Sequence, residues 1–191
     1  RAQSTAEAKA RELQARRAYG SYEALLEDPE IEAVYIGLPN GLHEPWALRV
    51  AEAGKHLLCE KSLTLSAASA ARVAEAFETR KLRLVEAFMY RHHPQWTTVR
   101  SLLANGTIGR LCSMRTGLFA RLDRDDDHRW STELGGGALY DVACYSVDAA
   151  RFLLDAEPQK VMAIADWHPS GVDASTHALL SFPDGDLATV A

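Results

Sequence analysis

The chain has 191 residues, of which 47% are hydrophobic and 25% are charged, and its net charge is −5. The apolar fraction is too high for a disordered chain, and the length allows one domain or two small ones. The mild acidity argues against a nucleic acid or an anionic membrane as the partner, because proteins that bind these carry a basic stripe.

Cysteine usage and the apolar runs bear on where the protein works. Cys59, Cys112 and Cys144 form no C-x-x-C pair, so the pattern indicates neither a disulfide framework nor a metal site. A reducing compartment, the cytoplasm, is the simplest fit. No apolar run reaches the roughly 18 residues of a membrane span. The first residue is Arg1, and a start within a helical pattern is typical of the interior of a longer protein.

The first half of the chain alternates predicted helices with short, continuously apolar strands. In chain order, the expected elements are helices at 2–17 and 21–26, a strand at 33–37, a helix at 43–53, a strand at 56–59, a helix at 66–79 and a strand at 82–88. Apolar strands separated by helices predict βαβ units and a parallel sheet that is covered on both faces.

Past residue 89 the pattern changes to a predicted α+β arrangement. The expected elements are a helix at 94–104, a strand at 110–122, a charged loop at 123–132, a helix at 138–154 and strands at 160–167, 176–182 and from 187 onward. The turn at 183–185 predicts that the last two strands form a hairpin, so antiparallel pairing is expected. The change of pattern predicts a first domain over residues 1–89 and a second over 90–191.

Two predicted strands end in polar sequence, at the edge where an open parallel sheet binds its ligands. Asn40 lies in the turn after the first of these strands, and Lys61 comes directly after the second. Asn40 alone is explained equally well as a loop residue. Lys61 is either a fixed positive charge for a ligand or a surface lysine that extends into solvent.

The helix expected at 138–154 carries a polar stripe. Asp141, Tyr145 and Asp148 are spaced by four and three residues, which places them on one face of an otherwise apolar helix. Buried polar groups without partners cost about 1–3 kcal/mol each, so the stripe needs partners if it is buried. The alternative is a solvent face, although such a face normally carries Lys or Glu. The glycines at 135–137 favour either a close backbone approach to a ligand or a plain loop.

Four segments, in the right order, carry a resemblance to a known family. They are V-Y-I-G-L-P-N-G-L-H at 34–43, G-K-H-L-L-C-E-K at 54–61, V-E-A-F-M-Y-R-x-H-P at 85–94 and G-G-G-A-L-Y-D-V at 135–142. The sequence resembles the NAD(P)-dependent oxidoreductases of the glucose–fructose oxidoreductase, inositol dehydrogenase and MocA family, and is most similar to the branch with dihydrodiol and xylose dehydrogenases.

This resemblance implies an α/β fold, in which an incomplete Rossmann-type parallel-sheet domain precedes an α+β domain with an open, mainly antiparallel sheet. The family's G-x-G-x-x-G segment is absent, so the chain is expected to be truncated, and at both ends. The implied assembly of the full-length parent is a homo-dimer or homo-tetramer that forms through the C-terminal sheet.

The resemblance also implies roles for particular residues. The lysine of the family's E-K-P motif falls on Lys61, followed here by Ser62, and its D-x-x-x-H pair falls on Asp141 and Tyr145. Tyr145 is then the acid/base, Lys61 favours its ionised form, and Asp141 orients the substrate. The implied cofactor residues are Arg1, Pro39, Asn40, His43, Glu60 and Lys61. The implied substrate residues are Arg91, Trp130, Asp141 and Tyr145.

The implied reaction is hydride transfer between a sugar or cyclic polyol and NADP or NAD, with no metal. By this resemblance Arg1 stands where the family contacts the ribose, and an arginine there suits a 2′-phosphate, which favours NADP. Two other interpretations stay open. A truncated, non-catalytic relative could bind a carbohydrate or another protein, and some relatives use bound NAD to cleave glycosides.

Overall fold

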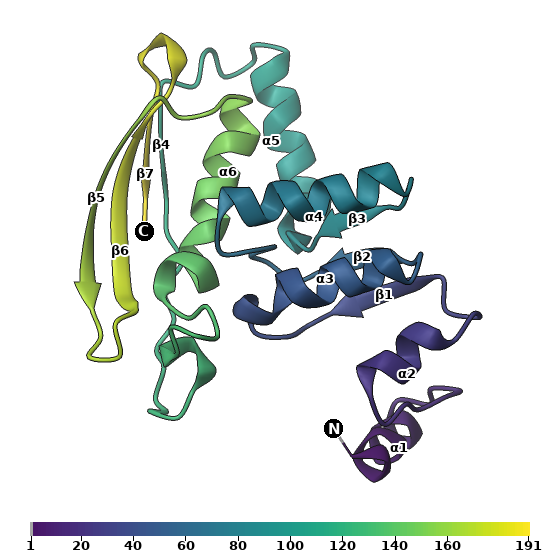
Figure 1. The fold of residues 1–191 in the computed structure, drawn as a ribbon. Coiled ribbons are helices and arrows are strands. Elements are labelled where there is room, and N and C mark those ends of the chain that lie inside the picture. Colours follow the sequence, from purple (N-terminus) through teal and green to yellow (C-terminus); the bar gives the residue numbers. More distant parts are fainter. Residues whose placement is uncertain (1) are drawn as a thin grey trace.

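The computed structural model describes residues 2–191, in which two separate β-sheets each carry their own helices (Figure 1). The first sheet has three strands in the order β1–β2–β3, and the second has four in the order β4–β7–β6–β5. Helix α6 packs against β4 and β7 of the second sheet. In Figure 1 it lies on the side of that sheet that faces the first one.

The first sheet is parallel, which confirms the predicted βαβ pattern. The expected cover on both faces is wrong for the described residues, because Tyr35, Leu58 and Val85, paired across the sheet on one face, are 60%, 42% and 46% exposed. Its strands are β1 (Ala33–Ile36), β2 (His56–Cys59) and β3 (Leu84–Glu86). The helices of this half are α1 (Gln3–Glu12), α2 (Tyr22–Glu27), α3 (His43–Glu52) and α4 (Ala67–Thr79). The buried core between them consists of Ile36, Ala47, Val50, Ala51, Leu57, Cys59, Val73 and Phe77.

Local chemistry explains where these helices begin and end. The Ser21 side chain accepts a hydrogen bond from the backbone N–H of Ala24 and caps α2, and Ser66 caps α4 in the same way. Helix α1 is shorter than the predicted 2–17. It ends at Glu12, and Gln14 has a left-handed φ of 53°, which a helix cannot continue through.

The second sheet is mixed rather than purely antiparallel. Its strands are β4 (Ser113–Thr116), β5 (Lys160–Trp167), β6 (Asp173–Ser181) and β7 (Leu187–Val190). The predicted hairpin of β6 and β7 is confirmed, and β5 also pairs antiparallel to β6, but β4 runs parallel to β7. The strand predicted at 110–122 is only four residues long, because it is paired on one side by the equally short β7.

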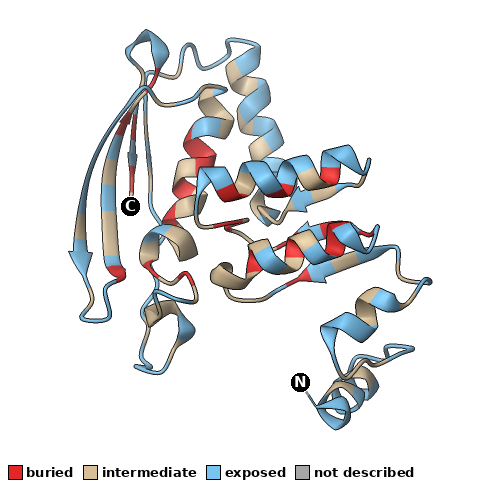
Figure 2. Cartoon of the chain, in the orientation of Figure 1, coloured by how far each residue is buried: buried red, intermediate tan, exposed pale blue. Residues whose placement is uncertain are grey.

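Two helices accompany this sheet, α5 (Pro94–Ala104) and α6 (Cys144–Leu154). The helix predicted at 138–154 opens with a π-helical turn, Leu139–Ala143, before α6 begins. Ala150 of α6 packs on a small core with Leu180, Phe182, Ala188 and Val190 from β6 and β7 and the turn between them. The strand β5, by contrast, is exposed along most of its length (Figure 2).

Among the described residues, no helix combines the length and the apolar character that crossing a lipid bilayer requires.

Candidate functional site

A cleft of about 440 Å³ opens where β1 and β2 end at the carboxyl edge of the first sheet. Residues from three distant segments line it, and among them are Pro39, Asn40, Glu60, Lys61, Arg129 and Asp141. Five of these six were expected at the site. The fold therefore brings together the polar turn after β1, the polar end of β2 and the start of the helical segment that leads into α6.

One carboxylate joins two cations in this cleft. Lys61 Nζ donates to the backbone oxygen of Asp141 at 2.5 Å and to its Oδ1 at 3.1 Å. Arg129 Nε donates to Asp141 Oδ2 at 2.8 Å. All three side chains are less than 40% exposed, so these ion pairs are less screened by water than surface pairs are. Asp141 is fixed from both sides.

Hydrogen bonds and tight backbone approaches hold the loop before this helix. Asn40 Nδ2 donates to the backbone oxygen of Gly135 at 3.0 Å. A Cβ on Gly136 would lie 2.1 Å from the backbone oxygen of Arg129. Gly137 has a φ of 107°, and a Cβ there would lie 2.1 Å from Oδ1 of Asp173, whose Oδ2 accepts from Leu139 N at 2.7 Å. The glycines thus allow the chain to pack on itself.

Tyr145 lies next to Lys61 and is enclosed by aromatic rings. Its ring centroid is 5.4 Å from Lys61 Nζ, and its ring packs edge-on against Phe88 at 5.5 Å and Tyr90 at 6.0 Å. Burial raises the pKa of Tyr145, and the charge of Glu60 raises it further. The phenol is therefore neutral in this state of the protein, even though a lysine stands beside it.

The turn after β2 has further fixed contacts. The Lys61–Ser62 peptide bond is cis, and Ser62 Oγ donates to the backbone oxygen of Tyr140 at 3.1 Å. Glu60 Oε1 accepts a hydrogen bond from the hydroxyl of Tyr35 at 2.8 Å. These bonds tie the end of β2 to β1 on one side and to the π-helical turn on the other.

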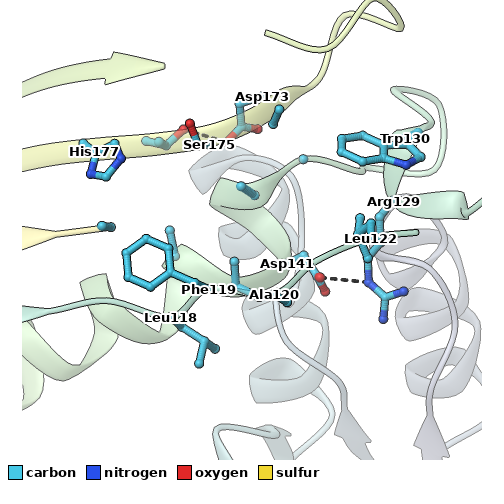
Figure 3. Close-up of a pocket in the computed structure, with 17 residues that line it drawn as sticks. Leu118, Phe119, Ala120, Leu122, Arg129, Trp130, Asp141, Asp173, Ser175 and His177 are labelled. Carbon is cyan, nitrogen blue, oxygen red and sulfur yellow. Dashed lines mark hydrogen bonds and ion pairs between the residues drawn. The ribbon is translucent and has the colours of Figure 1, made fainter. Parts of the chain in front are cut away.

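A second cavity, of about 250 Å³, lies on the other side of the Arg129–Asp141 pair (Figure 3). Phe119, Trp130 and His177 border it, and Figure 3 shows Asp141 and Arg129 joined at one end. Trp130 stacks on His168, with ring centroids 4.2 Å apart, and donates its indole N–H to the backbone oxygen of Arg124 at 3.2 Å. Arg129 and Asp141 line both cavities and form the wall between them.

Of the expected site residues within the described part of the chain, four do not line this cleft: His43, Arg91, Trp130 and Tyr145. Trp130 borders the second cavity, and Tyr145 lies beside Lys61. His43 is fully buried, and both of its ring nitrogens are bound to backbone oxygens, so its ring cannot face a cofactor. Arg91 donates through Nε to Asp148 Oδ2 at 2.8 Å and is held there by a second bond, because Asp148 is buried and needs a cation. Arg1 lies outside the described residues.

The sequence analysis did not assign several cleft residues to the site, among them Tyr35, His128 and Arg129. Arg129 lies in a charged loop with no periodic pattern, and Tyr35 lies in a strand whose apolar character suggested only a core position. The available signal for Arg129 was indirect: a carboxylate expected on a mostly apolar helix needs cationic partners. Among residues 2–191, no three His, Cys, Asp or Glu side chains lie close enough together to hold a metal ion.

Two family models match the chain almost from end to end. Residues 1–88 match a model described as an oxidoreductase family with an NAD-binding Rossmann fold. Residues 96–191 match the GFO/IDH/MocA C-terminal domain.

Three individual proteins illustrate the similarity. D-xylose 1-dehydrogenase (NADP(+)) 2 of Haloferax volcanii is 42% identical over 191 residues, which are 100% of this chain and 58% of that protein. KijD10, a 3-ketoreductase of Actinomadura kijaniata solved with NADP and TDP-benzene, has a TM-score of 0.90 and 33% identity, over 98% of this chain and 57% of that one. A levoglucosan dehydrogenase solved with NADH and levoglucosan has a TM-score of 0.89 and 28% identity, and the match covers 97% of this chain and 54% of that one. The chain thus spans little more than half the length of these proteins.

Proposed function

The chain belongs to the GFO/IDH/MocA family of NAD(P)-dependent oxidoreductases, and from this membership we propose that the protein transfers a hydride between NAD(P) and a sugar or cyclic polyol. The observation that carries the proposal is the ion pair of Lys61 and Asp141 in a cleft at the carboxyl ends of β1 and β2. Nucleotides bind at this edge of open parallel sheets. Tyr145, beside Lys61, adds the acid/base that interconversion of an alcohol and a carbonyl requires.

The cleft is chemically suited to the nicotinamide half of such a cofactor. Pro39 and Asn40 line it beside β1, and Glu60 and Lys61 line it beside β2. The Tyr35 hydroxyl holds one carboxylate oxygen of Glu60, which keeps that side chain directed along the cleft edge. These four lining residues are proposed to hold the cofactor, which supplies the hydride acceptor or donor when bound.

Tyr145 is proposed as the group that exchanges a proton with the substrate oxygen. Because its pKa is raised by burial, the phenol carries a proton at neutral pH and can donate it. This state suits the reduction of a ketone, whose oxygen needs a proton. For alcohol oxidation the phenol must first be ionised, and the positive charge of Lys61 favours that form.

Asp141 is proposed to orient the substrate. Its two oxygens are held in fixed directions by Lys61 and Arg129, so little freedom is lost when a sugar hydroxyl donates to one of them. A carboxylate has about four acceptor positions, so the two cations leave room for such a bond. The relatives named for xylose and levoglucosan support a sugar as the substrate.

Assembly of the protein into a homo-oligomer through the second sheet is also part of the proposal. Met162 and Ile164 on β5 are 72% and 76% exposed, and Met162 is directly opposite Leu179 of β6. Adjacent apolar side chains of this kind are typical of protein–protein interfaces. Light scattering after gel filtration tests the proposed assembly. Met162→Lys should convert a dimer or tetramer into a monomer. A wild-type protein that is itself a monomer would contradict the proposal.

Cofactor titration tests the central proposal. The complete product of the gene that encodes this chain is titrated with NADPH and with NADH, with nicotinamide fluorescence as the readout. Micromolar binding is expected, followed by turnover with xylose, levoglucosan or inositol as substrates. Lys61→Ala should abolish turnover, whereas Lys160→Ala on exposed β5 should not. Absence of binding to both cofactors at millimolar concentration would rule the proposal out.

A further inference from the structure

His43 makes two hydrogen bonds that join the ends of two strands. It is the first residue of α3 and its side chain is 0% exposed. Nδ1 lies 2.7 Å from the backbone oxygen of Ser62, just after β2, and Nε2 lies 2.7 Å from the backbone oxygen of Leu38, just after β1. The ring therefore bridges the two turns that contribute Asn40 and Lys61 to the cleft.

The chemistry of these partners determines where the protons are. A carbonyl oxygen accepts hydrogen bonds and has no proton to donate. Both ring nitrogens of His43 must then donate, which requires a proton on each of them. A neutral ring would direct the lone pair of one nitrogen at a carbonyl oxygen inside the protein, where no water can take its place. Only an imidazolium ion can donate a hydrogen bond to both of these oxygens.

A carboxylate holds the other end of the same peptide group. Glu86, the last residue of β3, accepts a hydrogen bond from the backbone N–H of Leu63 through Oε1 at 2.6 Å. The Ser62 oxygen and the Leu63 N–H belong to one peptide unit. That unit lies between a donor imidazole and an acceptor carboxylate, one peptide bond beyond Lys61.

The charges around Glu86 are consistent with this arrangement. Burial raises the pKa of Glu86, and the charge of Asp148 acts in the same direction. The Leu63 N–H, Arg91 and His43 act in the opposite direction and favour the carboxylate. His43 thus supplies positive charge where a partly buried carboxylate needs it.

We propose that His43, as an imidazolium ion, and Glu86, as a carboxylate, are positioning residues that clamp the Ser62–Leu63 peptide and thereby fix Lys61 in the cleft. Neither side chain touches the cofactor or the substrate. The proposal rests on the proposed function only in assigning Lys61 a role there. The clamp itself exists without a ligand and can be measured on this chain alone.

The protonation of His43 is tested by NMR on the chain with ¹⁵N-labelled histidine at neutral pH. His43 is assigned as the resonance that disappears in His43→Asn, and exposed His92 serves as the reference for a ring that exchanges with water. Both nitrogens of His43 should carry protons that exchange more slowly than those of His92. One nitrogen without a proton would overturn the imidazolium assignment.

The positioning of Lys61 is tested by its rate of acetylation, followed by mass spectrometry relative to exposed Lys160. His43→Asn should accelerate acetylation of Lys61 roughly threefold to tenfold, the change that follows from losing one ordinary hydrogen bond. Glu86→Gln, which keeps an acceptor oxygen for Leu63, should have a smaller effect.

Val73→Ala is the matched control, because it weakens the buried core of the first sheet without touching the clamp. An equal acceleration in this variant would show general loosening and overturn the proposal. The NMR measurement on the wild-type chain decides the matter if His43→Asn does not fold. If the proposed function is wrong, the titration with NADPH and NADH will show no binding, and this outcome is independent of the NMR and acetylation results.

Discussion

Arg129 Nε lies 2.8 Å from Asp141 Oδ2, and this contact joins a short 3-10 helical turn of the charged loop, His128–Trp130, to the π-helical turn that precedes α6, the helix that carries Tyr145. Asp127 binds the same guanidinium through both of its oxygens at 3.1 Å. The loop is thereby held against the cleft although its sequence is almost entirely polar. The direction of Asp141 then depends on a residue twelve positions earlier in the chain.

Replacing Arg129 by Leu should lower kcat/KM for the sugar substrate by about tenfold to a hundredfold, because Asp141 then keeps only Lys61 and loses its fixed direction. Steady-state kinetics with varied sugar measures this. Arg124→Leu is the matched control, since Arg124 pairs with Asp126 on the exposed part of the same loop. Equal losses in both variants would show that the loop, not the contact with Asp141, matters.

Replacing Tyr145 by Phe should reduce kcat by about 10²–10⁴-fold, the usual effect of removing a general acid or base. Cofactor affinity should stay unchanged, because the ring and its packing on Phe88 are kept. Stopped-flow measurement of nicotinamide absorbance gives the rate, and Tyr22→Phe on α2 is the control. Near-normal turnover of Tyr145→Phe would remove Tyr145 from the mechanism.

Replacing Asp148 by Asn should lower the free energy of unfolding by about 1–3 kcal/mol. The reason is that a buried carboxylate that accepts hydrogen bonds from two side chains loses its negative charge. Asp148 binds Arg91 and the hydroxyl of Tyr90 and is 4% exposed. Urea denaturation followed by circular dichroism measures the change. Asp126→Asn, in an exposed pair, should have no measurable effect. Equal stability of the two variants would contradict the role of this network.

The stability of the protein should depend on pH through Glu86. Its pKa is raised above the ordinary 4.5, mainly because its carboxylate is partly buried, so the folded protein binds this proton more tightly than the unfolded chain. The resulting stabilisation is complete below pH 4.5 and is lost as the pH rises through the higher folded-state value.

Urea denaturation at a series of pH values on either side of 4.5 measures the slope of the free energy of unfolding against pH. Glu86→Gln should flatten it, whereas Glu78→Gln on the exposed side of α4 should leave it as in the wild type. An unchanged slope in Glu86→Gln would assign the pH dependence to other groups.

Elements with a strong local signal were predicted well. The helix predicted at 94–104, which begins with Pro94, and the strands predicted at 56–59 and 160–167 have the same bounds in the structure as α5, β2 and β5. The mixed second sheet was not foreseen. Hairpin chemistry predicts only neighbours in sequence, and the parallel pairing of β4 with β7 joins strands more than seventy residues apart.

The site was predicted in part, and the misses have a physical cause. Lys61, Asp141 and Asn40 follow strands or lie in a helix, so their positions follow from the topology. His43 is the first residue of α3, beside the carboxyl edge of the first sheet. Sequence alone does not show whether its ring turns outward or into the protein. The two carbonyl oxygens that bind it, of Leu38 and Ser62, come from turns on either side of α3.

The wall shared by the two cavities gives them two side chains in common, Arg129 and Asp141. A ligand that draws Asp141 away from Arg129 in the cleft also changes the boundary of the cavity beside Trp130. Where a ligand in one cavity changes affinity in the other in this way, thermodynamic linkage requires the reverse effect to have the same factor. If the proposed function holds, selectivity for a substrate is expected to depend on both cavities, and substitutions at Phe119 or His177 are expected to change the affinity for the nucleotide without contacting it.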